Sequence, residues 1–178
     1  MERHIEHARQ LLAVLPEEGL AVDLGSGGGA PALPLACALP GLRWLLIESQ
    51  LRRADWLRLA VIQLGLGGRV DVIAERAEVV GHSAVRGTGA VVTARSFGPP
   101  AVTAECAAPL LGEGGQLWVA EPPDLGAPVT DRWPHNGPPM VGMVVVGRQG
   151  SWMGLRRQGP VAEKYPRRPG IPVKRPLF

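Results

Sequence analysis

The feature that most constrains this 178-residue chain is a glycine-rich turn that directly follows an apolar run. Residues 20–24 are apolar except for Asp23, and Gly25, Gly27 and Gly29 follow at every second position. Glycine adopts positive φ and has no Cβ, so such a turn lets a ligand approach the backbone. The amides that open the next helix can then receive a polar or anionic group. The pattern predicts a parallel strand whose carboxyl end holds a ligand.

A second acidic residue, Glu48, ends the next apolar run at residues 42–47. A carboxylate at this place can accept hydrogen bonds from two hydroxyls of a ribose. Asp23 is placed to hold a cationic amino group, such as that of a methionine moiety, whereas it would repel a pyrophosphate. Loop and carboxylates together predict a nucleoside-bearing cofactor and favour S-adenosylmethionine. The spacing G-x-G-x-x-A over residues 25–30 also fits a dinucleotide, so nicotinamide or flavin binding, or a turn without ligand, remain alternatives.

Length and composition are those of one α/β domain. With 46% hydrophobic residues, the chain can bury one core and has little room for a second. Its two cysteines, Cys37 and Cys106, are far apart in apolar stretches, where burial explains them, and we expect no metal site. The first residues do not resemble a signal peptide, and no apolar run approaches a membrane-spanning length. We therefore expect a soluble, cytoplasmic protein that does not bind membranes.

The apolar spacing predicts helices and strands that alternate along the chain and end in an antiparallel hairpin. The predicted strands cover residues 20–24, 42–48, 69–73, 90–94 and 116–120, and the hairpin covers 140–146 and 151–156. The predicted helices cover residues 2–15, 50–64 and 99–111, with one more ending at 39, and a long loop covers 121–139. This order predicts a doubly wound, Rossmann-like sheet of the methyltransferase type, with its ligand at the carboxyl ends of the strands. We divide the chain into a methyltransferase domain, residues 1–157, and a proline-rich basic tail, residues 158–178.

Polar residues follow two further predicted strands. After residues 69–73, the backbone amide of Ala77 or the carboxylate of Glu78 could bind the adenine amino group. Arg95 follows residues 90–94, so it either points into the cleft or pairs with an acidic neighbour, Glu48 or Glu78.

Positive charge is concentrated at the C-terminus. From residue 148 onward there are eight Lys or Arg and one Glu, whereas the whole chain carries a net charge of +3. Such a basic segment is typical of phosphate-backbone binding, and an exposed tyrosine can stack on a base. The proline content argues against a helix, so we expect an extended path; a solvated tail without partner is the alternative. The predicted RNA-binding residues are Lys164, Tyr165, Arg167, Arg168, Lys174 and Arg175.

Four segments together resemble a known family. They are the loop DLGSGGGAPALPLA at residues 23–36, the triplet Arg76-Ala77-Glu78, the pair Ala94-Arg95 and the ending YPRRPGIPVKRPL at residues 165–177. These segments resemble the bacterial 16S ribosomal RNA guanine-N7 methyltransferases, also called glucose-inhibited division protein B. The resemblance extends from about residue 3 to the C-terminus, and the combination of loop and ending makes it specific.

The resemblance implies a class I fold, S-adenosylmethionine as methyl donor and a guanine of small-subunit rRNA near the decoding site as acceptor. It implies 16S rRNA or the small ribosomal subunit as partner, and we expect a monomer. Guanine N7 has a lone pair in the ring plane, so no general base is needed and only alignment is required. We therefore predict no catalytic residue beyond a positioning role for Arg95. The predicted cofactor-binding residues are Asp23, Gly25, Ser26, Gly27, Ala30, Glu48, Ala77, Glu78 and Arg95, of which the resemblance itself places Gly25, Ala30, Ala77, Glu78 and Arg95.

The chain differs from the family pattern in three places, and we identify it as an N-terminally short, divergent member. Three residues precede His4, Ala30 and Ala32 are smaller than the usual residues, and Glu121-Pro122 replaces Lys-Gly after the fifth strand. The last change is expected to reverse the charge beside the cleft, where RNA phosphate approaches. Two alternatives remain: a methyltransferase of another RNA or of a small molecule, and a non-catalytic RNA-binding relative.

Overall fold

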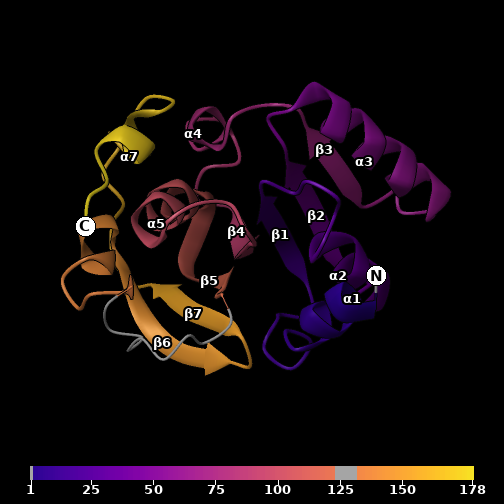
Figure 1. Ribbon diagram of the computed structural model, residues 1–178, viewed down its shortest axis with the longest axis horizontal. Helices are drawn as coiled ribbons and strands as arrows, with labels where there is room; N and C mark the ends of the chain where they lie inside the picture. The colour runs from indigo at the N-terminus through magenta and orange to yellow at the C-terminus, as the bar shows by residue number, and fades with distance from the viewer. Residues whose placement is uncertain (1, 123–131) are drawn as a thin grey trace.

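A seven-stranded mixed sheet organises the computed structural model, which describes residues 2–122 and 132–178, without the side chains of residues 2 and 3 (Figure 1). The strand order is β3-β2-β1-β4-β5-β7-β6. Strands β1 to β5 pair in parallel, and β7 pairs antiparallel with both β5 and β6. The strands are β1 (Gly19–Leu24), β2 (Leu42–Ile47), β3 (Val70–Ile73), β4 (Gly89–Ala94), β5 (Leu111–Ala120), β6 (Met143–Gln149) and β7 (Trp152–Arg157).

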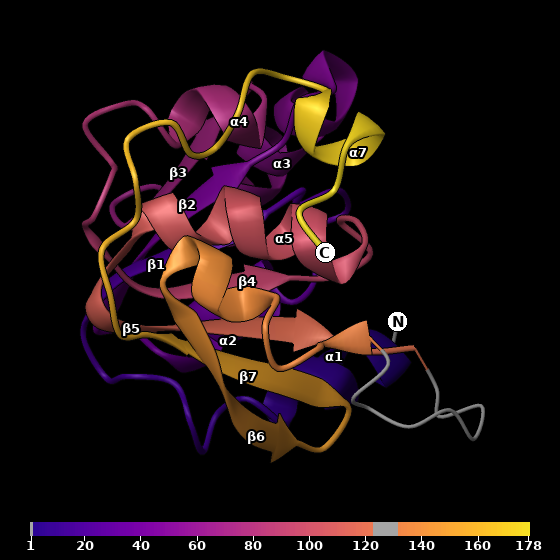
Figure 2. The ribbon, with the colours of Figure 1, turned by 90° about the vertical axis from the view of Figure 1, so that its left-hand side faces the viewer.

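Helices cover both faces of this sheet. One face carries α1 (Glu2–Arg9), α2 (Ala32–Ala38) and α3 (Leu51–Gln63). The other carries α4 (Ala77–Val80), α5 (Pro100–Ala107), the 3₁₀ turns η1 (Ala108–Leu110) and η2 (Pro138–Val141), and the C-terminal segment with α7 (Ile171–Lys174). Figure 2 shows α4, α5 and α7 together on that side.

Alternation along the strands divides the core between the two faces. In β1, Ala21 packs with the α1–α3 side, whereas Val22 and Leu24 pack with the α5 side. The same period of two holds in β2, where Trp44 and Leu45 belong to opposite clusters. Both faces of the sheet are therefore buried, as expected of a parallel sheet with helical crossovers.

The site is positioned by the pairing of β1 with both β2 and β4. Chain order reverses at β1, since β2 and β3 lie on one side and β4 and β5 on the other. The parallel register places Asp23 beside Thr93, and Leu24 beside Ile47 and Ala94. The carboxyl ends of three strands thus meet at one edge, which is where open α/β sheets bind ligands. The predicted doubly wound fold is confirmed.

Several element bounds differ from the prediction. Helix α1 ends at Arg9 rather than at residue 15, and turns follow, although Leu11 and Leu15 remain buried. Strand β5 begins at Leu111, the last residue of the predicted helix, because α5 ends at Ala107 and η1 covers Ala108–Leu110. Most of the predicted loop at 121–139 lies outside the described residues.

The C-terminal segment is not purely extended. It contains the single turn α7, whose Pro172 occupies the second position, where its missing N–H is not needed. Tyr165 is 6% exposed within the core, and Leu177 and Phe178 pack against the same cluster. The boundary at residue 157 therefore marks a change in amino-acid composition. It does not mark the end of the packed domain, because residues 158–178 pack on it. No helix in the described part of the chain is long and apolar enough to span a membrane.

A glycine in β7 tests the packing of this sheet. Gly154 lies opposite Trp118 of β5, and a Cβ added there would lie 2.6 Å from the Trp118 ring. We expect Gly154→Ala to lower the free energy of unfolding by about 1–3 kcal/mol through overpacking. Gly68→Ala is the matched control, because a Cβ at Gly68 meets no atom within 4 Å. Denaturant unfolding of both variants checks this, and equal stabilities would contradict it.

Candidate cofactor site

The glycine turn after β1 takes the shape that the sequence predicted. Gly25, Gly27 and Gly29 have φ of 65°, 51° and 83°, values that favour glycine. The amide of Ser26 donates to the Ile47 carbonyl at 3.0 Å, which ties the turn to the end of β2. At Gly25 a Cβ would lie 2.9 Å from the Phe97 ring, so the turn also contacts the segment after β4.

Asp23 lies under this turn and is 1% exposed. Its Oδ1 accepts a hydrogen bond from the Thr93 hydroxyl at 2.6 Å, and the Ser26 hydroxyl donates to its backbone carbonyl at 3.1 Å. Burial raises the pKa of Asp23 to about 6, although the Thr93 and Ser26 hydroxyls and the charge of Arg95 oppose this. At neutral pH the end of β1 therefore carries a poorly solvated negative charge, which suits the cationic amino group that Asp23 is predicted to hold.

Glu48 is fixed by the same turn. Its Oε2 accepts from the Gly27 amide at 2.9 Å, and its Oε1 accepts from the Gln50 amide at 2.8 Å. These two bonds orient a carboxylate that is only 4% exposed and leave each oxygen a further lone pair. That arrangement fits the predicted pair of ribose hydroxyls.

The first turn of α4 holds the two adenine candidates, Ala77 and Glu78. Glu78 Oε1 accepts from Arg76 Nη2 at 3.0 Å and from the Gly170 amide at 3.1 Å, and the residue is 4% exposed. Burial opposes its ionisation, but these hydrogen bonds outweigh burial and lower the pKa of Glu78. Both donors bind the same oxygen, Oε1, so Glu78 and Ala77 both remain candidates for the adenine contact: the carboxylate could accept from the amino group, and the Ala77 N–H could donate to a ring nitrogen.

Arg95 follows β4 and reaches across to helix α1. Its Nη2 lies 2.6 Å from Nδ1 of His4, which must be the acceptor because a guanidinium only donates. Among the described residues it forms no ion pair with Glu48 or Glu78, so the prediction of that pairing is wrong. The positive charge of Arg95 opposes the rise in the pKa of Asp23. The pKa of His7 is lowered mainly by burial, and the charge of Arg95 lowers it further. Arg95 thus lies near Asp23 and contacts α1, and its place in the cofactor site stays a prediction.

The predicted RNA-binding residues separate into buried and exposed ones. Tyr165 is buried, so the prediction that its ring stacks on a base is wrong. Arg167 donates to both carboxylate oxygens of Glu105, at 2.8 and 2.6 Å, and therefore serves the fold. Lys164, whose Nζ lies 5.1 Å from the centre of the Tyr165 ring, remains exposed, as do Arg168, Lys174 and Arg175.

Glu121 does not reverse the charge of the cleft as predicted. It is 8% exposed and forms an ion pair with Arg132. Its Oε1 also accepts from the indole N–H of Trp133 at 3.0 Å. The replacement of Lys-Gly by Glu121-Pro122 is thus compensated by a neighbouring cation, which the sequence prediction did not consider.

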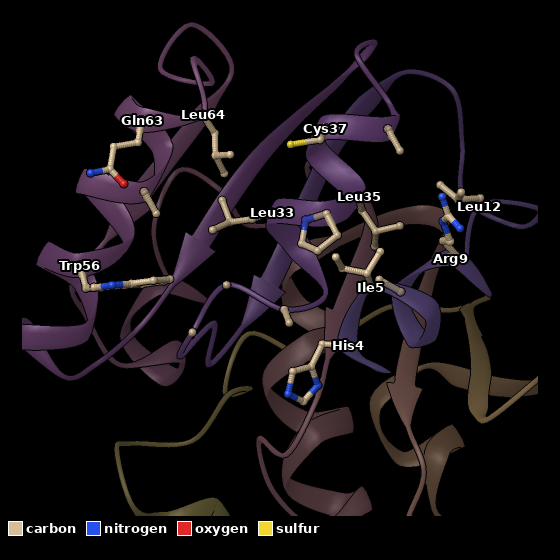
Figure 3. A pocket seen from close by; sticks show the side chains of 17 residues that line it. His4, Ile5, Arg9, Leu12, Leu33, Leu35, Cys37, Trp56, Gln63 and Leu64 are labelled. Atoms are coloured by element: carbon tan, nitrogen blue, oxygen red, sulfur yellow. The ribbon is translucent and has the colours of Figure 1, made fainter. Parts of the chain in front are cut away.

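A groove of about 900 Å³ lies behind the glycine turn (Figure 3). Its walls come from α1, α2 and α3 and are largely apolar, and its edge includes Gly28, Gly29 and Ala30. Ala30 therefore lies at the point where the turn meets this groove. Asp23 and Glu48, at the carboxyl ends of β1 and β2, do not line the groove.

The comparison with protein families decides between the interpretations of this cleft. The family model of rRNA small subunit methyltransferase G matches residues 1–121. The chain belongs to this family. Membership confirms the predicted resemblance and methyltransferase activity with S-adenosylmethionine as donor, rather than dinucleotide binding.

Curated relatives match nearly the whole chain. The ribosomal RNA small subunit methyltransferase G of Syntrophomonas wolfei is 32% identical, over 99% of this chain and 86% of its own length. The protein of the same name from Deinococcus radiodurans is 36% identical, over 92% of this chain and 68% of its own length.

Solved structures support the class I fold. P. horikoshii TYW2 in complex with MeSAdo has a TM-score of 0.62 and 14% identity, over 85% of this chain and 59% of its own. The antibiotic-resistance methyltransferase Kmr has a TM-score of 0.59 and 14% identity, over 86% of this chain and 93% of its own. At these identities the likeness concerns the fold alone.

Sequence reasoning missed three residues that contact the predicted site residues: His4, Thr93 and Phe97. Thr93 is a buried hydroxyl inside the apolar strand β4, and such a group requires a partner, which could have indicated the bond to Asp23. His4 and Phe97 gave no signal, because only the fold brings them to Arg95 and Gly25.

We expect Asp23→Asn to stabilise the folded protein and to weaken cofactor binding. Because the folded-state pKa of about 6 exceeds the ordinary 3.8, protonation of Asp23 stabilises the fold, and this contribution is lost as the pH rises through 6. The variant should therefore be more stable than the parent at pH 8, by about 3 kcal/mol, and about equal at pH 3.5.

The same variant should bind S-adenosylmethionine roughly tenfold or more weakly at pH 8, because the charge-assisted bond to the amino group is lost. The parent's affinity should fall below pH 6, and that of the variant should not. Thermal unfolding and calorimetric titration measure both effects, with the exposed Asp71→Asn as control. Unchanged affinity would show that Asp23 does not hold the amino group.

Proposed function

We propose that this protein transfers the methyl group of S-adenosylmethionine to N7 of a guanine in 16S ribosomal RNA, and that it acts as a monomer in the cytoplasm. The observation that carries the proposal is the glycine turn bound to Glu48 above the buried Asp23, in a chain of the rRNA small subunit methyltransferase G family. The names of the curated relatives support the rRNA substrate.

The residues of the cleft fit the three parts of the donor. Asp23 offers a buried negative charge to the methionine amino group, Glu48 offers two fixed carboxylate oxygens to the ribose, and Ala77 offers a backbone amide to the adenine. S-adenosylmethionine supplies an electrophilic methyl on a cationic sulfur. The protein's part is to hold that methyl at the carboxyl ends of β1 and β4.

Attack by N7 makes few demands on the protein. The ring nitrogen already has its lone pair, so the cleft must align N7 with the methyl group and exclude competing orientations. Arg95, beside Asp23 and bonded to His4, is the cation placed to contact the RNA or to balance the cleft's carboxylates. We assign it a positioning role.

The exposed cations of the C-terminal segment form the proposed RNA surface. Arg168, Lys174 and Arg175 are exposed around α7, and Gly170 in the same segment bonds to Glu78 of the cofactor site. Phosphates bound there would therefore lie beside the cleft. Arg76, whose side chain is 49% exposed, adds a further cation at the start of α4.

Transfer of labelled methyl groups to small ribosomal subunits that lack this modification tests the proposal. We expect label at a single guanine, at N7, with wild-type protein and much less with Asp23→Asn at limiting S-adenosylmethionine. Protein that binds S-adenosylmethionine but labels no subunit would contradict the rRNA substrate. Label at another ring atom would contradict the N7 chemistry.

Arg168→Ala tests the RNA surface. Loss of one phosphate contact should weaken binding to small subunits and reduce the slope of log K against log salt by about 1. Arg43→Ala is the matched control, because Arg43 is also an exposed arginine and lies near the amino end of β2, away from the carboxyl ends of the strands. Binding isotherms measured between about 50 and 200 mM salt give both slopes. Equal slopes for both variants would show that Arg168 does not contact RNA phosphate.

A further inference from the structure

The C-terminal segment is bonded to the first turn of α4 and to the residues that follow the helix. After the helix, Nε2 of His82 donates to the Pro166 carbonyl at 2.7 Å, and Arg86 donates to the Tyr165 carbonyl at 2.7 Å. At its first turn, the Gly170 amide donates to Glu78 at 3.1 Å. Helix α4 is a single turn of four residues, and a helix this short is not stable by itself. Its position therefore depends on the segment that crosses it.

One residue anchors that segment to the core. The backbone amide and Nε of Arg167 both donate to Oε1 of Glu105 at 2.8 Å, and Nη2 donates to Oε2 at 2.6 Å. Glu105 lies in α5 and is fully buried, whereas the Arg167 side chain is 24% exposed. Three hydrogen bonds to one buried carboxylate fix the position of both the backbone and the side chain of Arg167.

The anchor and the bond to α4 belong to one small loop. Gly170 lies three positions after Arg167 and has φ of 81°. The Ile171 amide donates to the Arg168 carbonyl at 3.0 Å, and Arg167 Nη2 donates to the Arg175 carbonyl at 2.7 Å. These bonds close residues 167–175 around α7. Movement of Arg167 would therefore move the Gly170 amide that holds Glu78.

We infer that Arg167, held by Glu105, is a positioning residue for cofactor binding. It does not touch the cofactor; it fixes residues 167–175, which hold Glu78 and keep the Ala77 amide facing the adenine. The inference rests on the proposed function, because it assigns the adenine to the first turn of α4. It also gives neighbouring arginines different tasks, since Arg167 serves the cofactor site and Arg168 serves the RNA surface.

Arg167→Lys and Glu105→Gln test this in the full chain. Lysine keeps the positive charge at Arg167 but cannot make the fork of two bonds, and glutamine keeps one acceptor at position 105 without the charge. For both variants we expect the Kd and KM for S-adenosylmethionine to rise about tenfold, while kcat at saturating donor stays within about twofold. Amide hydrogen exchange at residues 77–81 should accelerate in the protein without ligand. Arg168→Ala is the control and should leave Kd for S-adenosylmethionine and this exchange unchanged.

The outcomes separate the possible failures. A lowered Tm with unchanged Kd, KM and α4 exchange would overturn the inference and leave Arg167 a purely structural role. Accelerated exchange with a higher Kd and an unchanged kcat supports it. Wild-type protein that binds S-adenosylmethionine but methylates no rRNA would contradict the proposed substrate and leave this inference standing on the binding data.

Discussion

The hydrogen bond between Thr93 and Asp23 joins the two halves of the sheet at the point on which the rest of the site depends. It connects β4 to β1 at 2.6 Å, where the order of the strands reverses, and it lies out of contact with water. A carboxylate there raises the free energy of the folded protein, as its elevated pKa shows. The fold tolerates this because a parallel sheet buried on both faces is stabilised along its whole length. Local destabilisation of this kind is common where a ligand binds.

The second constraint comes from the C-terminus. Eight cations lie from residue 148 onward, yet two of them, Arg157 and Arg167, are used within the fold. Arg157 donates to backbone carbonyls at Leu111 and Gly159, and Arg167 neutralises Glu105. A count of charges therefore overstates the positive surface offered to RNA. The arrangement also explains why a proline-rich segment is ordered: its carbonyls and amides find partners on α4 and α5.

Much of the fold and of the cleft could be predicted from the sequence, because those features depend on short-range patterns. The spacing of apolar residues predicted the succession of helices and strands along the chain. The glycine turn, Asp23 and Glu48 predicted that the cofactor binds at the carboxyl ends of the strands. The burial of Tyr165, the pairing of Arg167 and the compensation of Glu121 could not be predicted in this way. Each depends on contacts that only the folded chain creates. In the sequence, Glu105 resembles an ordinary glutamate on the surface of a helix, whereas the structure shows that it is buried with most of α5.

The groove behind the glycine turn shows how one loop serves two environments. Gly29 and Ala30 face the apolar walls formed by α1 and α3, while Gly27 gives its amide to Glu48 on the other side. A larger residue at Gly29 would meet Leu33 of α2, so the small residues let α2 pack closely behind the turn. Because the turn is held between this packing and the carboxylate, its amides are oriented before any ligand arrives. Preorganisation of this kind reduces the conformational entropy lost on binding, and it explains why glycines, rather than polar side chains, dominate the sequence at this edge.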